Sequence, residues 1–259
     1  MMKKFIFTCI AVLMLVQSCA YVDVKIGIIG AMDVEVKLLK ENAVITRKTV
    51  KAGMEFCEGK LGDNDVVIVK CGMGKVNSGI CAQMLIDLFN VSHIINSGVA
   101  GALNDSLNIG DIVVATDVVQ HDYDVTHIGF KAGEIPYTGK YAFETDRTLR
   151  YEAVKAVHAV APETQVVEGR ICTGDQFLSE REKFNRIISI FGGNCVEMEA
   201  GAIAQVCYLN NVPFVIIRAI SDKIGTSVED YKKFEASTAE RCASITKYMA
   251  ENFKTKGDN

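Results

Sequence analysis

Short apolar segments rich in valine and isoleucine alternate with segments of helical pattern along most of this chain. We expect buried strands at residues 25–30, 92–97, 111–116, 166–172 and 214–220. Helices are expected at 33–42, 75–89, 146–160, 179–191 and 228–253, with a further one directly after residue 199. Apolar strands that alternate with helices are typical of a parallel sheet covered on both faces. The pattern therefore predicts an α/β fold: a single-domain three-layer sandwich whose mixed, largely parallel central sheet is flanked by helices.

Local signals refine this prediction. A hairpin is expected where segment 55–61 is followed by segment 65–71, which makes the sheet mixed. The helix at 179–191 is expected to begin with a capping box, Ser179–Glu182. The glycine-rich run 96–101 predicts a loop that separates two strands.

Length and charge bound the class of protein. The 259 residues suit one domain, and no boundary is evident after residue 24, so we assign residues 25–253 to a single domain. The 28 basic and 32 acidic side chains give a net charge of −4, and no run of lysine or arginine occurs. We therefore expect a small-molecule substrate and do not expect nucleic acid as a partner.

Residues 1–20 have the features of a bacterial secretory signal. Two lysines precede an apolar run over 5–16, which is too short to span a bilayer, and small residues follow it. The protein is therefore expected to be exported, either to the periplasm or as a membrane-anchored lipoprotein. Lipidation of Cys19, in a relaxed lipoprotein cleavage box, would anchor it, whereas cleavage after Ala20 would release a soluble protein. If the signal hypothesis is wrong, the protein is cytoplasmic.

Several familiar motifs are incomplete. Seven of the nine cysteines lie beyond the signal segment, scattered in apolar runs without a CxxC motif, which predicts buried thiols rather than a disulfide framework. The spacing in His121–His127 fits no established metal motif. Gly72–Lys75 lacks the first glycine and the Ser or Thr of a phosphate loop, so we do not expect nucleoside triphosphate binding.

Two carboxylates, Glu197 and Glu199, lie in the otherwise apolar, small-residue run 196–204. Apolar residues on both sides predict burial, and an unpaired buried carboxylate is costly. The run spans a strand-to-helix junction, where α/β proteins collect ligands. From this run alone, a ligand-binding pair and a pair that makes only structural hydrogen bonds are equally open.

Two further acids follow apolar strands. Glu35 enters the first turn of a helix, where a carboxylate is favourable even without a function. Asp222 ends a strand, where burial would raise its pKa and allow it to donate a proton, although it could also cap the following turn. The nearby run 96–101 suits either a backbone close to a small ligand or a plain turn. Neither acid is decisive alone.

Seven segments, taken in order, resemble the 5′-methylthioadenosine/S-adenosylhomocysteine nucleosidases of the nucleoside phosphorylase superfamily. They are Ile28–Glu35, Gly72–Val76, Asn96–Gly101, Gly110–Val114, Gly174–Phe177, Val196–Ala200 and Val212–Asp222. The ordered set covers about residues 25–253 and is specific, although no single segment is. The resemblance implies a nucleoside phosphorylase-like fold. It also implies hydrolysis of the N-glycosidic bond of 5′-methylthioadenosine and S-adenosylhomocysteine, with 5′-deoxyadenosine as a further candidate, to release adenine and the 5-substituted ribose.

The resemblance also implies roles for individual residues. Asp222 would protonate N7 of adenine, and Glu35, assisted by Arg218, would act as general base on the attacking water. The remaining implied substrate contacts are Glu199, Met198 and Glu197 for the ribose, Phe177 and Leu178 for adenine, Met32, Met73 and Tyr231 for the 5′-alkylthio group, and Ala100, Gly101 and Ser221 elsewhere in the pocket.

Three residues, Ile128, Phe130 and Pro136, match positions that family members lend to a neighbouring subunit, so the resemblance implies a homodimer. It implies neither a metal nor an organic cofactor. The chain departs from the family pattern at two places. Val99 replaces a common serine and removes a hydroxyl near the attacking water, while Tyr231 replaces a frequent phenylalanine and adds a hydroxyl beside the 5′ pocket.

Three alternatives to this hydrolase stay open. A phosphate-dependent phosphorylase on the same fold would need a cationic cradle, but only Lys75 and Arg218 lie near the glycine-rich loops. Another purine nucleoside, such as futalosine, is a candidate substrate because proton donation by Asp222 suits several purines. A lipid-anchored nucleoside-binding protein is disfavoured because the chain retains the acids Glu35, Glu199 and Asp222.

Overall fold

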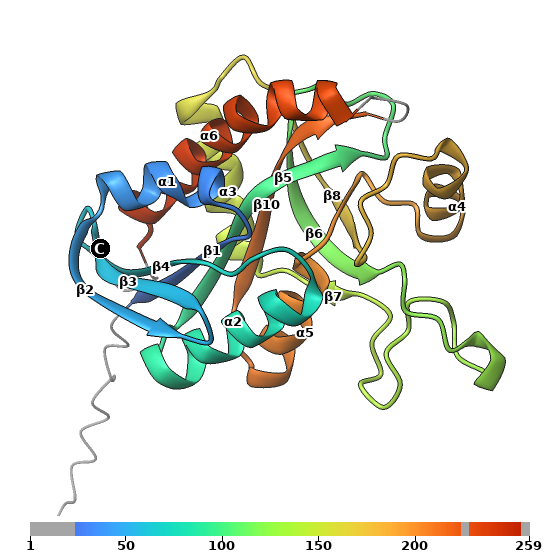
Figure 1. The fold of residues 1–259 in the computed structure, drawn as a ribbon, viewed down its shortest axis with the longest axis horizontal. Coiled ribbons are helices and arrows are strands. Elements are labelled where there is room, and N and C mark those ends of the chain that lie inside the picture. The colour runs from blue at the N-terminus through green and yellow to red at the C-terminus, as the bar shows by residue number, and fades with distance from the viewer. Residues whose placement is uncertain (1–23, 224–227, 255–259) are drawn as a thin grey trace, which may run out of the picture.

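The computed structural model describes residues 24–223 and 228–254, in which helices cover both faces of a mixed sheet (Figure 1). The strands are β1 (Lys25–Gly30), β2 (Val44–Lys51), β3 (Met54–Leu61), β4 (Asn64–Lys70), β5 (His93–Ala102), β6 (Ile112–Gln120), β7 (Phe143–Glu144), β8 (Val166–Thr173), β9 (Cys195–Glu197) and β10 (Phe214–Asp222). The helices are α1 (Asp33–Asn42), α2 (Lys75–Phe89), the 3₁₀ turn η1 (Thr126–Ile128), α3 (Arg147–Val160), α4 (Arg181–Phe191), α5 (Ala200–Asn210) and α6 (Val228–Asn252). The predicted signal segment, with Cys19, lies outside the described residues.

The sheet is partly closed. Its strands are hydrogen-bonded in the order β10-β6-β8-β9-β5-β1-β4-β3-β2, and β10 pairs with β5 as well. Five strands therefore form a ring, from which β1, β4, β3 and β2 extend. β1 is parallel to both of its neighbours, and β5 is parallel to β10, whereas β3 is antiparallel to both β2 and β4. The predicted mixed sheet with parallel strands at its centre is confirmed.

Two helical layers complete the sandwich. α6 packs on α1, α3 and β10 on one face, while α2 packs on α5 on the other (Figure 1). Each layer has its own apolar core against the sheet, one with Leu39, Leu149 and Ile245 and the other with Leu85 and Ile203. The predicted three-layer arrangement is therefore confirmed.

The structure corrects the sequence predictions at three places. β5 continues through the glycine-rich run to Ala102, so this run is strand and not loop. α4 begins at Arg181 after an N-cap, Glu180, that makes no side-chain cap hydrogen bond, so the predicted capping box at Ser179 is wrong. β2 was not expected, because an edge strand exposed to solvent needs few apolar residues and gives a weak pattern.

Three further findings concern residues 24–223 and 228–254 alone. All seven cysteines of this part of the chain are free and buried. No helix in it has the length and apolar character needed to cross a membrane. No cluster of three or more His, Cys, Asp or Glu side chains in it is arranged to hold a metal ion.

Candidate active site

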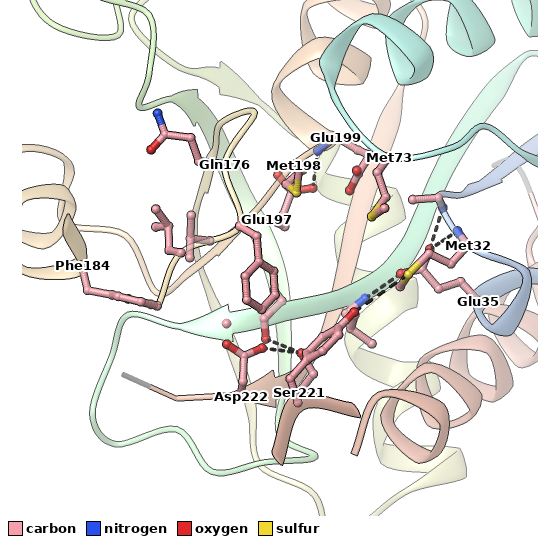
Figure 2. Close-up of a pocket in the computed structure, with 18 residues that line it drawn as sticks. Met32, Glu35, Met73, Gln176, Phe184, Glu197, Met198, Glu199, Ser221 and Asp222 are labelled. Atoms are coloured by element: carbon pink, nitrogen blue, oxygen red, sulfur yellow. Dashed lines mark hydrogen bonds between the residues drawn. The ribbon is translucent and has the colours of Figure 1, made fainter. Parts of the chain in front are cut away.

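A cavity opens at the carboxyl ends of β1, β5 and β10, and 18 residues line it (Figure 2). Of the residues that the resemblance places in this chain's own pocket, all line the cavity except Arg218. The lining is completed by Ala31, Val99, Gln176, Phe184 and Val196. Phe184 lies in α4, outside every segment that carries the resemblance, so the sequence offered no local signal for it.

Glu35 is held at the first turn of α1 by backbone hydrogen bonds. Its Oε2 accepts from the N–H groups of Ala31 and Met32 at 2.6 and 2.9 Å, and its Oε1 accepts from Val99 N–H at 3.0 Å. Burial raises the pKa of Glu35, while the Arg218 charge and these three N–H groups act in the opposite direction. The carboxyl is therefore fixed in position but easily protonated, as suits a general base.

Asp222 is the last residue of β10, and its side chain faces the cavity. The hydroxyl of Ser221 donates a hydrogen bond to Oδ1 at 2.7 Å. Burial raises the pKa of Asp222, and this hydrogen bond lowers it by less. An acid whose neutral form is favoured by burial is suited to donate a proton.

The glycines of β5 make room for these two acids. A Cβ atom at position 98 would lie 2.5 Å from Glu35 Oε1, and one at position 101 would lie 2.8 Å from Asp222 Oδ2. Both distances are shorter than any real contact, so a larger residue would displace the carboxyl group. The glycine-rich run therefore lets two catalytic candidates approach a strand, which differs from the predicted loop around a ligand.

Both carboxylate oxygens of Glu197 accept hydrogen bonds from the protein itself. Its Oε2 accepts hydrogen bonds from Glu199 N–H at 3.0 Å, Ala200 N–H at 2.8 Å and Arg218 Nη2 at 2.6 Å. Its Oε1 accepts from the hydroxyl of Thr173. Arg218 is 1% exposed and lies behind the carboxylates instead of lining the cavity. The pair therefore fixes the β9–α5 junction, and its contact with a substrate would be indirect.

Glu199 keeps more of its binding capacity for a ligand. Its Oε1 accepts from Gly74 N–H at 2.9 Å, and its Oε2 lies 4.0 Å from Arg218 Nη2. Burial, followed by the charge of Glu197, raises the pKa of Glu199 to about 8. The two acids that are equivalent in the sequence thus differ: Glu197 is a structural partner, and Glu199 is available to the cavity.

One ion pair and two hydrogen bonds from backbone N–H groups to carboxylates hold the loops at the mouth of the cavity. Lys75 Nζ lies 2.6 Å from Asp122 Oδ1, and Asp122 Oδ2 accepts from Asp175 N–H at 2.9 Å. Asp175 Oδ1 accepts in turn from Lys75 N–H at 2.8 Å. These bonds join the loop that carries Met73 to the loop that carries Phe177. Lys75 therefore has a structural partner and is not held ready for a phosphate group.

The residues expected to serve a neighbouring subunit lie away from this cavity. Ile128, Phe130 and Pro136 belong to the segment between β6 and β7 and do not line the chain's own site. Ile128 is 71% exposed. Their position is compatible with a role in another subunit's site, which stays a prediction.

Comparison with known proteins identifies the family. The family model described as the phosphorylase superfamily matches residues 25–251. The 5′-methylthioadenosine/S-adenosylhomocysteine nucleosidase of Psychromonas ingrahamii is 41% identical over 220 residues, covering 83% of this chain and 94% of that protein. The chain belongs to this nucleosidase family. The nucleosidase of Shewanella denitrificans is similar as well, at 43% identity over 199 residues that cover 76% of this chain and 86% of that protein.

Solved structures of the family have the same fold. The nucleosidase of Colwellia psychrerythraea, in complex with adenine, matches with a TM-score of 0.84 at 36% identity, over 88% of this chain and 95% of that one. The Neisseria meningitidis nucleosidase, in complex with methylthio-immucillin-A, matches with a TM-score of 0.85 at 32% identity, over 88% and 99%. Futalosine hydrolase of Helicobacter pylori also matches, with a TM-score of 0.84 at 30% identity, over 89% and 99%. The nucleoside phosphorylase-like fold predicted from the resemblance is confirmed.

Proposed function

We propose that the protein hydrolyses the N-glycosidic bond of 5′-methylthioadenosine and S-adenosylhomocysteine, releasing adenine and the 5-substituted ribose. The observation that carries this proposal is the set of buried acids on one cavity. Glu35, Glu199 and Asp222 come from three separate elements and meet between apolar side chains such as Met73 and Phe177. The names of the similar proteins, two of them solved in complex with adenine or with methylthio-immucillin-A, agree with it.

The chemistry divides between two acids. As the bond between C1′ and N9 breaks, Asp222 gives its proton to N7, so that the electron pair of the bond leaves on a neutral base. Water adds its hydroxyl oxygen to C1′ and transfers a proton to Glu35. Positive charge develops on the ribose between these events. This charge favours the ionised form of Glu199 at the ribose hydroxyls, and the carboxylate in turn stabilises the charge. Val99 contributes its N–H to Glu35, so water is positioned without a hydroxyl from this residue.

The charges of the cavity favour water over phosphate as the nucleophile. Its 18 lining residues, all within the described part of the chain, include four acids and neither lysine nor arginine. The two cations nearest the glycine-rich segments are already paired, Lys75 with Asp122 and Arg218 with Glu197. A phosphate anion would meet repulsion without a compensating cradle. This supports a hydrolase over a phosphorylase.

The deciding experiment measures free adenine released from 5′-methylthioadenosine by protein that lacks residues 1–20, with and without inorganic phosphate. We expect release without phosphate, together with free methylthioribose. Release only with phosphate would assign the protein to the phosphorylases and remove the role of Glu35 as base. If neither condition gives adenine, other 6-substituted purine nucleosides such as futalosine are tested next. Tight nucleoside binding without turnover would identify a binding protein.

Glu199→Gln is expected to lower kcat by about 10- to 100-fold and to change KM less, because a charge-assisted hydrogen bond to the ribose strengthens in the transition state.

Since the pKa of Glu199 is raised from 4.5 to about 8, the unliganded folded state binds more protons than the unfolded chain between these values. The free energy of unfolding should therefore fall as pH rises from about 4.5 to 8, and less so in the variant. Steady-state kinetics and thermal melts across this range test both points, and a loss of affinity alone would restrict Glu199 to binding.

We propose further that the protein is a homodimer. Val76, Ile80 and Leu88 on α2, and Leu209 on α5, are between 42% and 71% exposed. Because α2 packs on α5, these exposed apolar side chains lie on two adjacent helices, which favours a subunit interface. Sedimentation velocity should give a dimer, and Leu209→Glu should shift it toward the monomer. Tyr151→Glu, a change at an exposed residue of α3, serves as control. A monomeric wild-type protein at micromolar concentration would overturn this proposal.

Export stays a proposal that rests on residues 1–20 alone. If it holds, mass spectrometry of protein from its native host should show a mature chain that begins at lipidated Cys19 or at Tyr21. These two starts distinguish an anchored lipoprotein from a soluble exported enzyme. A chain that keeps Met1 would overturn the export proposal.

A further inference from the structure

The hydroxyl of Tyr231 is an unusual feature of the cavity wall. Tyr231 lines the cavity from α6, and its ring makes an edge contact with Phe177 at 5.4 Å between centroids. Its Oη lies 3.9 Å from the sulfur of Met32, which lines the same cavity. The two cavity side chains that Tyr231 contacts here, Met32 and Phe177, are both apolar.

Glu235 fixes the direction of that hydroxyl. It lies four residues after Tyr231, hence on the same face of α6, and its Oε1 accepts the hydrogen bond from Tyr231 Oη at 2.7 Å. A hydrogen bond to a carboxylate is stronger than one to a thioether sulfur, so the single proton of the hydroxyl points to Glu235. The lone pairs of Oη are then left for a donor in the cavity.

The electrostatic surroundings make this oxygen a better acceptor. Burial raises the pKa of Tyr231, and the hydrogen bond to Glu235 and the charges of Glu235, Glu35 and Asp222 raise it further, so the hydroxyl stays protonated. Met32, Phe177 and Tyr231 carry no positive charge themselves. A group that donates a hydrogen bond, or is itself cationic, is therefore favoured beside Tyr231 Oη, and an anionic group is repelled.

This oxygen lies where the 5′ substituent of a bound nucleoside would end, an argument that rests on the proposed function. With the base protonated at Asp222 and the ribose hydroxyls at Glu199, the 5′ carbon is directed to the remaining wall. The resemblance to the family assigns Met32, Met73 and Tyr231 to that wall, and all three line the cavity. A methylthio group can pack there on sulfur and aromatic carbon but cannot donate to Tyr231 Oη.

We infer that Tyr231, oriented by Glu235, is a specificity-determining acceptor for the 5′ group, so that this enzyme takes purine nucleosides with a 5′ hydroxyl or a 5′ protonated amine in addition to thioethers. The hydroxyl substrate uses the hydrogen bond alone. The amine substrate uses the hydrogen bond and the negative charge of Glu235. The two substrates therefore separate the contributions of the two residues.

The experiment compares kcat/KM for adenosine, 5′-amino-5′-deoxyadenosine and 5′-methylthioadenosine. Tyr231→Phe should lower kcat/KM for adenosine and for the amine, each taken relative to kcat/KM for the thioether, by about 10-fold or more, because the hydroxyl and the amine each lose their hydrogen-bond acceptor. In Glu235→Gln the amide oxygen still accepts from Tyr231, so the adenosine ratio should stay within about threefold while the amine ratio falls by about 10-fold. Glu240→Gln, at an exposed position of the same helix, should change neither ratio.

Unchanged ratios in Tyr231→Phe would overturn the inference. The double variant Tyr231→Phe with Glu235→Leu removes the carboxylate that the single change leaves without its donor, so that a folding defect does not obscure the result. Calorimetric binding of the same three nucleosides measures this selectivity independently of turnover. Absence of adenine release from all three would count against the proposed function. Ratios of binding affinity that are the same in the wild-type protein and in Tyr231→Phe would count against the role of Tyr231.

Discussion

Replacement of Asp222 by Asn is expected to lower kcat for adenine release by about 10²- to 10⁴-fold while the protein stays folded. The amide has nearly the shape of the carboxyl and can still accept the hydrogen bond from the Ser221 hydroxyl, which is 2.7 Å long in the wild-type protein. It cannot deliver a proton to N7, so the base must leave as an anion. The measurement is adenine release in single-turnover and steady-state assays, with circular dichroism to check the fold.

A substrate with a better leaving group separates proton donation from positioning. With a 5-methylthio-riboside of p-nitrophenol, which leaves without protonation, the same variant should lose less than about 10-fold, because the general acid contributes little to that reaction. Asp63→Asn, in the exposed turn between β3 and β4, is the matched control and should leave both substrates unaffected. Near-normal adenine release by Asp222→Asn, or equal losses with the two substrates, would remove Asp222 from the role of acid.

The alternation of apolar strands and helices was sufficient to predict the layers of this fold, because burial of each strand on both faces leaves a strong pattern in the sequence. The continuation of β5 through Gly98 and Gly101 was not predictable in the same way. Glycine weakens a strand and usually indicates a turn, and the reason for it here is the approach of Glu35 and Asp222, which come from distant parts of the chain. Local patterns carry no information about such contacts.

The site shows the same limit. The sequence brought Glu197 and Glu199 to attention together, and nothing in their spacing distinguishes them. The distinction comes from Arg218 and Thr173, which occupy the oxygens of Glu197, and from Gly74, which leaves part of Glu199 free. Resemblance to a family supplied candidate roles for single residues, whereas the division of work within the pair required the packing of four separate segments.

Replacement of Glu35 by Gln is expected to reduce kcat by about 10²- to 10⁴-fold, because the amide cannot accept the proton of the attacking water. The variant should also lose about 1–3 kcal/mol of stability. The wild-type carboxylate accepts hydrogen bonds on both oxygens, from the N–H groups of Ala31 and Met32 on one and from that of Val99 on the other. Gln replaces one of these oxygens by an NH₂ group, which cannot accept a hydrogen bond, so the N–H donors on that side lose their acceptor. Calorimetric binding of adenine, measured on the folded fraction, should change little.

The pH dependence of kcat/KM then decides which acid has which role. Burial raises the pKa values of both Glu35 and Asp222. A base must be ionised and an acid protonated, so activity should fall as pH drops below the pKa of Glu35 and as pH rises above the pKa of Asp222. The residual activity of Glu35→Gln should therefore lose its dependence on the acidic side and keep that on the alkaline side, and Asp222→Asn should show the converse. The opposite result is that Glu35→Gln loses the dependence on the alkaline side and Asp222→Asn loses that on the acidic side. In that case Asp222 is the base and Glu35 the acid, and the direction in which water attacks the ribose is reversed.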